Sequence, residues 1–139
     1  VSRGLGDVYK RQLHEMGLAP CAYSMTFNVT GDTLNAILNQ RSQDMLTANN
    51  WNVCQYAALL IMFAKASGLK AGELVHVIAD AHIYDRHIDA VKRIIEKEPY
   101  PAPEMVVEDI TDFYKFTKNS FTLKDYKYHD FDEKIEVAI

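Results

Sequence analysis

A nearly uninterrupted apolar stretch, from Trp51 to Ser67, is the feature that most constrains the fold of this chain. Its sequence, WNVCQYAALLIMFAKAS, is rich in helix-forming residues and is apolar on nearly every side. Asn50 is placed to cap its start and Gly68 to end it. The run is too short, and too often interrupted by polar residues, to cross a bilayer. These features predict one central buried helix, with Cys54 in the core.

Shorter apolar patterns on both sides of this stretch predict β-strands. Apolar and polar residues alternate from Tyr23 to Val29, and Gly31-Asp32 then offers a hairpin turn before a partner strand that ends at Leu38. A run from Leu74 to Ala79 has the composition of a buried strand, and a second helix follows, with apolar residues at positions 88, 91, 94 and 95. The segments EMVVED and SFTLKDY are further strand candidates. We therefore expect an α+β fold, with a mixed or antiparallel sheet packed on one long buried helix.

The length and charge of the chain argue against several classes of protein. With 139 residues, 48% of them hydrophobic, it has the size of a single domain. The net charge is −4 and the basic residues are scattered, so the sequence predicts neither nucleic-acid binding nor a membrane span. Cys21 and Cys54 lack the spacing of a zinc knuckle or a CxxC motif, and no secretory signal is recognisable. We expect free thiols and a cytoplasmic location.

The first twelve residues, VSRGLGDVYKRQ, differ from the rest of the chain. They show no apolar period, and Asp7 to Gln12 can be back-translated as GATGTGTATAAGAGACAG, which resembles an adapter used in sequencing libraries. We therefore expect residues 1–12 to be an adapter-like or disordered segment. Residues 13–139 are expected to be the C-terminal part of a single domain that is incomplete at its N-terminus.

Cys21 can be interpreted in two ways. Free cysteines are among the most buried residues, so a packed thiol is the simpler interpretation. Arg41 and several polar side chains follow one strand pair later, and a nearby cation stabilises a thiolate nucleophile. The residues alone favour the packed thiol and leave the nucleophile open.

The segment DAHIYDRH contains four side chains of the types that bind metals. His82 and His87 are five residues apart, which misses the i, i+4 spacing of helical zinc sites, so we expect no metal. If a strand continues from Ala79 to Tyr84, then Asp80, His82 and Tyr84 share one face and are suited to bind sugar hydroxyls. A strand end whose polar groups face water explains the same pattern equally well.

Several motifs together resemble the C-terminal part of thymidylate synthase. They are APC, QRSQDML nineteen residues after the cysteine, NWNVCQYA, DAHIYDRH, EPYPAP and a final VAI, in the order and spacing of that family. The resemblance implies the family's α+β fold and the reductive methylation of deoxyuridylate (dUMP) to thymidylate (dTMP). It also implies 5,10-methylenetetrahydrofolate as a co-substrate, no metal, and a homodimer.

The resemblance implies a role for each matching residue. Cys21 matches the nucleophile that adds to C6 of the uracil, and Arg41 and Ser42 match phosphate ligands. Asn52 matches the residue that recognises the pyrimidine by accepting from N3 and donating to O4. Hydroxymethylases for deoxycytidylate carry Asp at this place, so Asn52 indicates a uracil substrate. The other matches are His82 and Tyr84 for the deoxyribose 3′-hydroxyl, Asp44 and the C-terminal Ile139 for folate, Gln40 for the substrate-binding side chains, and Asp80 for the catalytic polar groups.

The chain also departs from the family pattern. Ala22 stands where His is often found, and Glu136 stands where Pro is usual before the last three residues. The N-terminal half of family members, with a further phosphate-binding arginine and the glutamate that organises proton transfer, has no counterpart. We therefore expect little or no turnover from this chain alone. A deoxypyrimidylate hydroxymethylase and a non-catalytic nucleotide-binding fragment are the alternatives.

Overall fold

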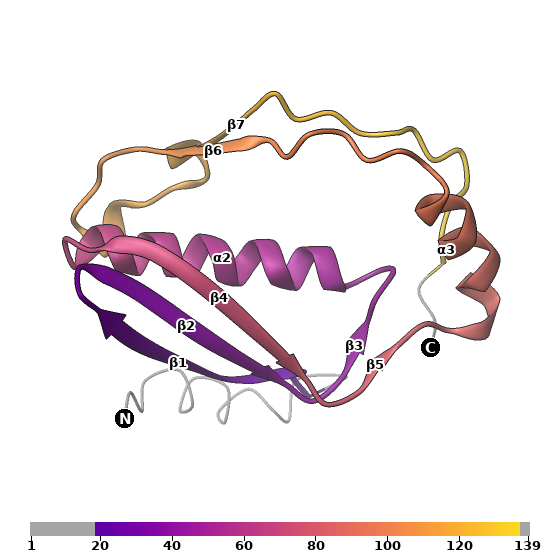
Figure 1. Ribbon diagram of the computed structural model, residues 1–139, viewed down its shortest axis with the longest axis horizontal. Helices are drawn as coiled ribbons and strands as arrows, with labels where there is room; N and C mark the ends of the chain where they lie inside the picture. The colour runs from indigo at the N-terminus through magenta and orange to yellow at the C-terminus, as the bar shows by residue number, and fades with distance from the viewer. Residues whose placement is uncertain (1–18, 137–139) are drawn as a thin grey trace.

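The largest sheet of the computed structural model, which describes residues 19–136, is mixed (Figure 1). Strands β1 (Ala22–Thr30) and β2 (Thr33–Gln40) pair antiparallel, and β2 pairs parallel with β4 (Lys70–Ile78), giving the order β1-β2-β4. Gly31 takes a φ of +63° in the loop between β1 and β2, which glycine adopts at no steric cost. The predicted hairpin and the mixed sheet are confirmed.

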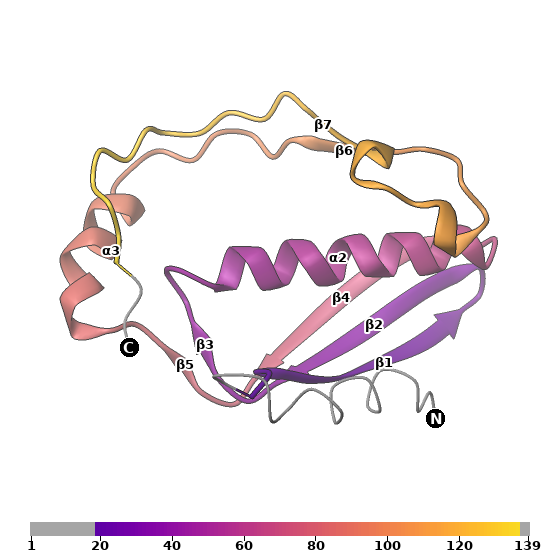
Figure 2. The same cartoon turned by 180° about the vertical axis from the view of Figure 1, so that it is seen from behind.

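The long helix α2 (Asn49–Ala66) lies across one face of this sheet, in the crossover between β2 and β4 (Figures 1 and 2). Leu60 and Ala64 of the helix form the buried core with Leu34 and Ala36 of β2. The side chains of β2 alternate between the two faces of the sheet, so every second residue meets the helix. The α+β fold with a sheet packed on a long helix is therefore confirmed.

The ends of α2 agree only partly with the prediction. The helix begins two residues earlier than expected, its N-cap is Ala48, and no side chain caps it, so the prediction that Asn50 is the cap is wrong. At the other end Gly68 takes a φ of +68°, and the amide of Leu69 donates back into the last turn at 2.8 Å. Gly68 therefore ends the helix as predicted.

Much of α2 is exposed, although the sequence predicts a buried helix. Within this helix only Leu60 and Ala64 are fully buried, and Trp51 is 78% exposed. Cys54 is also exposed, so its predicted place in the core is wrong. A helix that is apolar all round contains no sequence signal for the face that meets the sheet.

Shorter elements complete the fold. The remaining strands form two pairs, β3 (Gln43–Asp44) parallel with β5 (Ala81–His82), and β6 (Glu104–Val107) antiparallel with β7 (Phe121–Lys124). The remaining helical elements are η1 (Asp85–His87), α3 (Ile88–Ile95), η2 (Phe113–Lys115) and η3 (Lys118–Ser120). In both views the β6–β7 pair lies on the side of α2 that faces away from the sheet (Figures 1 and 2).

Two features of the sequence analysis fall outside the described residues. These are the segment 1–12 and Ile139, so the expectations for both stay predictions. No helix in residues 19–136 combines the length and the apolarity that crossing a membrane requires.

Candidate functional site

The predicted site residues gather where β2 and β4 end. Because these strands are parallel, their carboxyl ends lie at the same edge of the sheet. The amide of Ala79 donates to the carbonyl of Gln40 at 3.0 Å, and the amide of Gln43 donates to the carbonyl of Asp80 at 2.9 Å. The pairing of β3 with β5 thus brings the QRSQD and DAHIYDRH segments side by side (Figure 1).

Cys21 lies beside Arg41 at this edge. Cys21 directly precedes β1, which pairs with β2, and the amide of Arg41 donates to the carbonyl of Cys21 at 2.9 Å. The guanidinium of Arg41 donates to the carbonyl of Ala19 at 2.7 Å, while Arg41 itself remains exposed. Cys21 is a half-buried free thiol. Cys21 and Arg41 are therefore adjacent, one directly before β1 and the other directly after β2.

Asp80 links Ser42 to His82. The hydroxyl of Ser42 donates to Oδ2 of Asp80 at 3.3 Å, and Nδ1 of His82 lies 3.2 Å from the same oxygen. The His82 contact has the distance of an ion pair but not the geometry of a hydrogen bond. The rings of Tyr84 and His82 form a T-shaped contact with centroids 5.1 Å apart. The structure thus brings together Asp80, His82 and Tyr84, although β5 ends at His82.

A chain of hydrogen bonds connects Asn52 to the interior of the sheet. Nδ2 of Asn52 donates to Oε1 of Gln43 at 2.7 Å, and Nε2 of Gln40 donates to the same oxygen. Oε1 of Gln40 in turn lies 2.9 Å from Nε2 of His76. Gln40 and Gln43 are each 2% exposed, so the chain is buried for most of its length. We call Gln40, Gln43, Asn52 and His76 the amide chain.

The direction of the amide chain is set by a backbone carbonyl. Nε2 of Gln40 also donates to the carbonyl of Ser42 at 2.8 Å, and a carbonyl can only accept. Oε1 of Gln40 must therefore point to His76, which donates, and Oε1 of Gln43 must accept from Asn52. Burial lowers the pKa of His76, so its ring is neutral at pH 7. Oδ1 of Asn52 is left to accept a hydrogen bond from a ligand.

Sequence reasoning missed Gln43 and His76. Gln43 stands inside the QRSQD motif, and its position between two assigned residues was the available signal. His76 interrupts an apolar strand run, but its contact with Gln40 depends on the parallel register of β2 and β4. A single sequence does not determine that register.

Asp44 is held by the turn that precedes α2. Its Oδ1 accepts from the amides of Leu46 at 2.9 Å and Thr47 at 3.2 Å, and its Oδ2 accepts from the Thr47 hydroxyl. Burial alone would raise the pKa of Asp44, but these hydrogen bonds, with a smaller electrostatic contribution from His87, lower it. Asp44 is therefore an ionised, half-exposed acceptor near the Cys21 edge.

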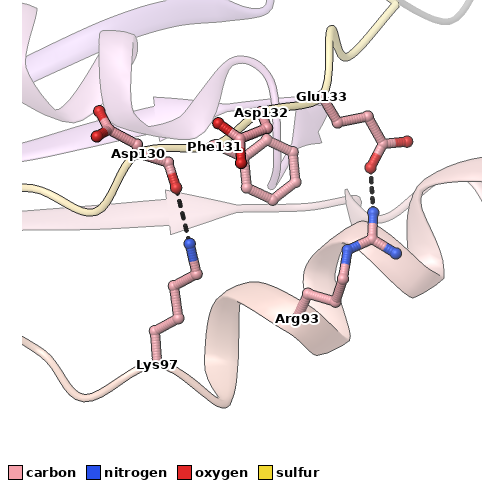
Figure 3. Close-up of a pocket in the computed structure, with 6 residues that line it drawn as sticks. All are labelled: Arg93, Lys97, Asp130, Phe131, Asp132 and Glu133. Atoms are coloured by element: carbon pink, nitrogen blue, oxygen red, sulfur yellow. Dashed lines mark hydrogen bonds and ion pairs between the residues drawn. The ribbon is translucent and has the colours of Figure 1, made fainter.

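Two further features of the described residues bear on function, the metal-binding residue types and a surface pocket. Within residues 19–136, no three His, Cys, Asp or Glu side chains are grouped as metal ligands. A pocket of about 300 Å³ lies between α3 and the chain that leads to the C-terminus, and none of its lining residues was predicted as part of the site (Figure 3). The arrangement at the Cys21 edge combines a thiol, a cation and oriented amides, which suits covalent attack on an anionic heterocycle.

Comparisons with known proteins agree with the motifs. The family model described as Thymidylate synthase matches residues 5–139. Thymidylate synthase 1 of Bacillus spizizenii is 39% identical over 120 residues, which are 86% of this chain and 43% of that protein. Thymidylate synthase of Bacillus phage phi3T is 40% identical over 119 residues, covering 85% and 43% of the two chains.

A solved structure has the same fold. It is the thermostable thymidylate synthase A from Bacillus subtilis, which matches with a TM-score of 0.85 and 38% identity. The match covers 94% of this chain and 47% of that structure. The chain therefore spans about half the length of these relatives.

Proposed function

Because the chain belongs to the thymidylate synthase family, we propose that it supplies the nucleophile and the nucleotide-binding side chains for the methylation of dUMP to dTMP. The co-substrate of this proposed reaction is 5,10-methylenetetrahydrofolate, which supplies a one-carbon unit and a hydride. The observation that carries the proposal is the placement of Cys21, Arg41 and Asn52 around one edge of the sheet. These three side chains match the needs of a thiol addition to an anionic uracil nucleotide.

Cys21 performs the covalent step in this proposal. Its thiolate adds to C6 of the uracil, forming an S–C6 bond and moving the C5–C6 electron pair toward O4. C5 then becomes nucleophilic enough to attack the one-carbon unit. Loss of the C5 proton then expels the folate nitrogen and leaves an exocyclic methylene group on C5. Hydride transfer from the folate to that methylene gives the methyl group, while the S–C6 bond breaks and the C5–C6 double bond is restored, so that dihydrofolate and the free thiolate are left. The backbone amide of Arg41 donates a hydrogen bond to the carbonyl of Cys21, and the guanidinium of Arg41 is proposed to provide positive charge beside the thiolate.

The polar side chains at the strand ends bind the rest of the nucleotide. Arg41 and Ser42 are proposed to hold the phosphate, with His82 and Tyr84 on the 3′-hydroxyl. Asp80 contacts both Ser42 and His82, so it positions one proposed ligand of the phosphate and one proposed ligand of the 3′-hydroxyl. Asp80, which the resemblance places among the catalytic polar groups, is therefore proposed as a positioning residue.

The amide chain supports a uracil base rather than cytosine. With Nδ2 of Asn52 fixed on Gln43, Oδ1 is available to accept from N3–H of uracil, and the second Nδ2 proton is available to O4. Cytosine presents an acceptor at N3 and a donor at C4, so it requires the reverse orientation. A deoxypyrimidylate hydroxymethylase is therefore the less favoured alternative.

Folate binding and assembly complete the proposal. Asp44 is an ionised acceptor suited to the N–H groups of a pterin, and the C-terminal Ile139 is proposed to close over the folate. Since this chain spans about half the length of its relatives, we propose that it has little or no turnover in isolation. Alone, it would then behave as a non-catalytic nucleotide-binding fragment. We further propose a homodimer and a cytoplasmic location, where the free thiols Cys21 and Cys54 stay reduced.

The nucleophile can be tested by trapping a covalent adduct. In the full-length protein, meaning this chain behind its native upstream sequence, 5-fluorodeoxyuridylate and methylenetetrahydrofolate should form an adduct that survives denaturation. Cys21→Ala should abolish it, because the sulfur is lost, whereas Cys54→Ala should retain it. Mass spectrometry of the denatured protein measures both. An unmodified full-length protein, or an adduct that requires Cys54, would refute the catalytic assignment.

A further inference from the structure

His87 is a buried histidine that no step of the proposed reaction uses, although it contributes to the lowered pKa of Asp44. It ends η1, is 4% exposed, and its Nε2 lies 2.9 Å from the carbonyl of Glu136. Because that carbonyl can only accept, Nε2 of His87 carries the proton and donates. Nδ1 is buried and has no hydrogen-bond partner. A buried nitrogen without a partner disfavours folding, so packing alone does not explain an imidazole at this position.

The segment that His87 holds is the end of the described chain. Upstream of Glu136 this C-terminal segment, residues 129–136, is fixed to α3 and the loop after it (Figure 3). Arg93 forms an ion pair with Glu133, and Nζ of Lys97 donates to the carbonyl of Asp130 at 2.8 Å. The ring of Phe131 lies 5.9 Å from the Arg93 guanidinium and 5.7 Å from the Lys97 ammonium. The bond from His87 is therefore the last of a series of anchors.

His87 also contacts the proposed nucleotide site. The rings of His87 and Tyr84 form a T-shaped contact with centroids 5.9 Å apart, and the amide of His87 donates to the carbonyl of Tyr84 at 2.8 Å. Tyr84 in turn contacts His82, whose carbonyl accepts from the amide of Met45 at 3.0 Å. One buried ring thus lies between the C-terminal segment and the strand pair β3–β5.

We propose that His87 is a positioning residue that fixes the C-terminal segment relative to the strand end bearing His82 and Tyr84. Through its ring, a displacement at Glu136 is transmitted to Tyr84, and a displacement of the strand end is transmitted to the segment. The catalytic consequence rests on the proposed function, because it assumes that His82 and Tyr84 bind the nucleotide. The mechanical coupling between Glu136 and Tyr84 does not depend on the proposed function.

The test compares two amides of different length in the full-length protein. His87→Gln places a donor near the position of Nε2 and should keep the bond to Glu136, whereas His87→Asn is one methylene shorter and should lose it. His129→Phe is the matched control. The ring of His129 also hydrogen-bonds a backbone carbonyl, that of Glu98 at 2.8 Å, but it stacks on Tyr100 and not on Tyr84. Two sites report the effect: cleavage after Glu136 by a glutamate-specific protease, and hydrogen exchange at the Met45 amide.

His87→Asn should speed both processes by about tenfold, as expected for one lost hydrogen bond. His87→Gln should stay within about threefold of the unsubstituted protein, by the same scale. The His129→Phe control should speed cleavage in the segment and leave Met45 exchange unchanged. In steady-state kinetics, His87→Asn should raise KM for dUMP with a smaller change in kcat. His87→Gln should have a KM close to that of the unsubstituted protein.

Three results would overturn the proposal. These are equal behaviour of His87→Asn and His87→Gln, unchanged exchange at Met45 in His87→Asn, and unfolding of both variants, which would make His87 purely structural. If the unsubstituted full-length protein shows no turnover, the proposed function fails. Cleavage and exchange still decide the role of His87 in that case.

Discussion

Gln43 controls which way the Asn52 amide faces. Its Oε1 accepts from Asn52 and from Gln40, and no apolar side chain can take over that role. An asparagine that is free to rotate by 180° exchanges its donor and its acceptor, so it can pair with cytosine as well as with uracil. The proposed preference for uracil therefore depends on Gln43 as well as on Asn52.

Gln43→Leu should reduce discrimination between dUMP and deoxycytidylate. Removing the acceptor frees the Asn52 amide, and the loss of about one hydrogen bond corresponds to about five- to tenfold in the ratio of kcat/KM values. Gln43→Glu keeps the Oε1 acceptor for Asn52 and should preserve the ratio, although it loses the donation from Nε2 to the carbonyl of Asp44 at 3.3 Å. Release of tritium from C5 of either nucleotide in the full-length protein measures it.

Asn52→Asp is the reference variant for the same measurement. It should shift the preference toward deoxycytidylate, because a protonated or water-bridged carboxyl can meet the reversed pattern of that base. An unchanged preference in Asn52→Asp would mean that Asn52 is not the residue that recognises the pyrimidine. An unchanged ratio in Gln43→Leu would instead show that other contacts hold the Asn52 amide.

His76, at the other end of the amide chain, predicts a dependence of stability on pH. Its pKa lies below the ordinary 6.5 because burial disfavours the charged ring. As the pH falls below about 6.5, the unfolded chain takes up a proton on this histidine before the folded chain does. The free energy of unfolding should therefore decrease as the pH falls from about 6.5, until the pH lies below the pKa of His76 in the folded chain.

Urea unfolding of the full-length protein between pH 7 and pH 5 measures this effect. His76→Gln still donates to Gln40 but does not titrate, so its free energy of unfolding should fall less over the same interval. Parallel pH profiles for the two proteins would contradict the assignment of this proton uptake to His76.

At the scale of elements, local patterns located strands and the long helix, but they predicted neither the cap and exposed face of α2 nor the pairing of distant segments. The alternation around Tyr23 to Val29 predicted β1, because a period of two residues is a property of the strand itself. The two-residue strands β3 and β5 carry no such pattern and exist only because distant segments pair. For the same reason, the motif resemblance predicts Arg41 and His82 as site residues, but only the structure showed that Asp80 joins their segments.

The start of β4 offers a test of close packing between strands. The register of β2 and β4 shifts near Gly72, where an added Cβ would lie 2.2 Å from Oδ1 of Asn35 and 2.6 Å from Cγ2 of Thr33. Asn35 has little freedom to move away, because its Oδ1 accepts from the amide of Glu73 at 3.0 Å. Gly72→Ala should therefore reduce the free energy of unfolding by about 1–3 kcal/mol.

Gly68→Ala is the comparison for this prediction. Its Cβ would meet nothing within 4 Å, so only the φ of +68° opposes the substitution, at a cost of about 1–2 kcal/mol. Urea denaturation of both full-length variants measures the difference. An increase in stability for Gly72→Ala would show that the strands are not packed closely here.

At the scale of the whole molecule, residues 19–136 cover one face of the sheet with α2 and leave side chains exposed on the other. Leu34 and Ala36 of β2 face α2, so Ile37, between two buried neighbours, faces the opposite side. Ile37 pairs with Val75, and the two side chains are 43% and 48% exposed. Val77, two residues further along β4, is 48% exposed on the same side. Apolar side chains on an open sheet face are typical of an interface with another chain.

The proposed homodimer can therefore be tested by placing a charge on this open face. Val75→Lys should weaken association of the full-length protein, because two copies of a symmetric contact would each bury an unpaired ammonium. Val29→Lys is the matched control: Val29 is 53% exposed on a strand, but it pairs with Leu34 and so lies on the α2 side. Sedimentation equilibrium should show a dissociation constant at least about tenfold higher for Val75→Lys, since an unpaired buried charge costs more than 1.4 kcal/mol. Equal dissociation constants for the two lysine variants would exclude the open face as the dimer contact.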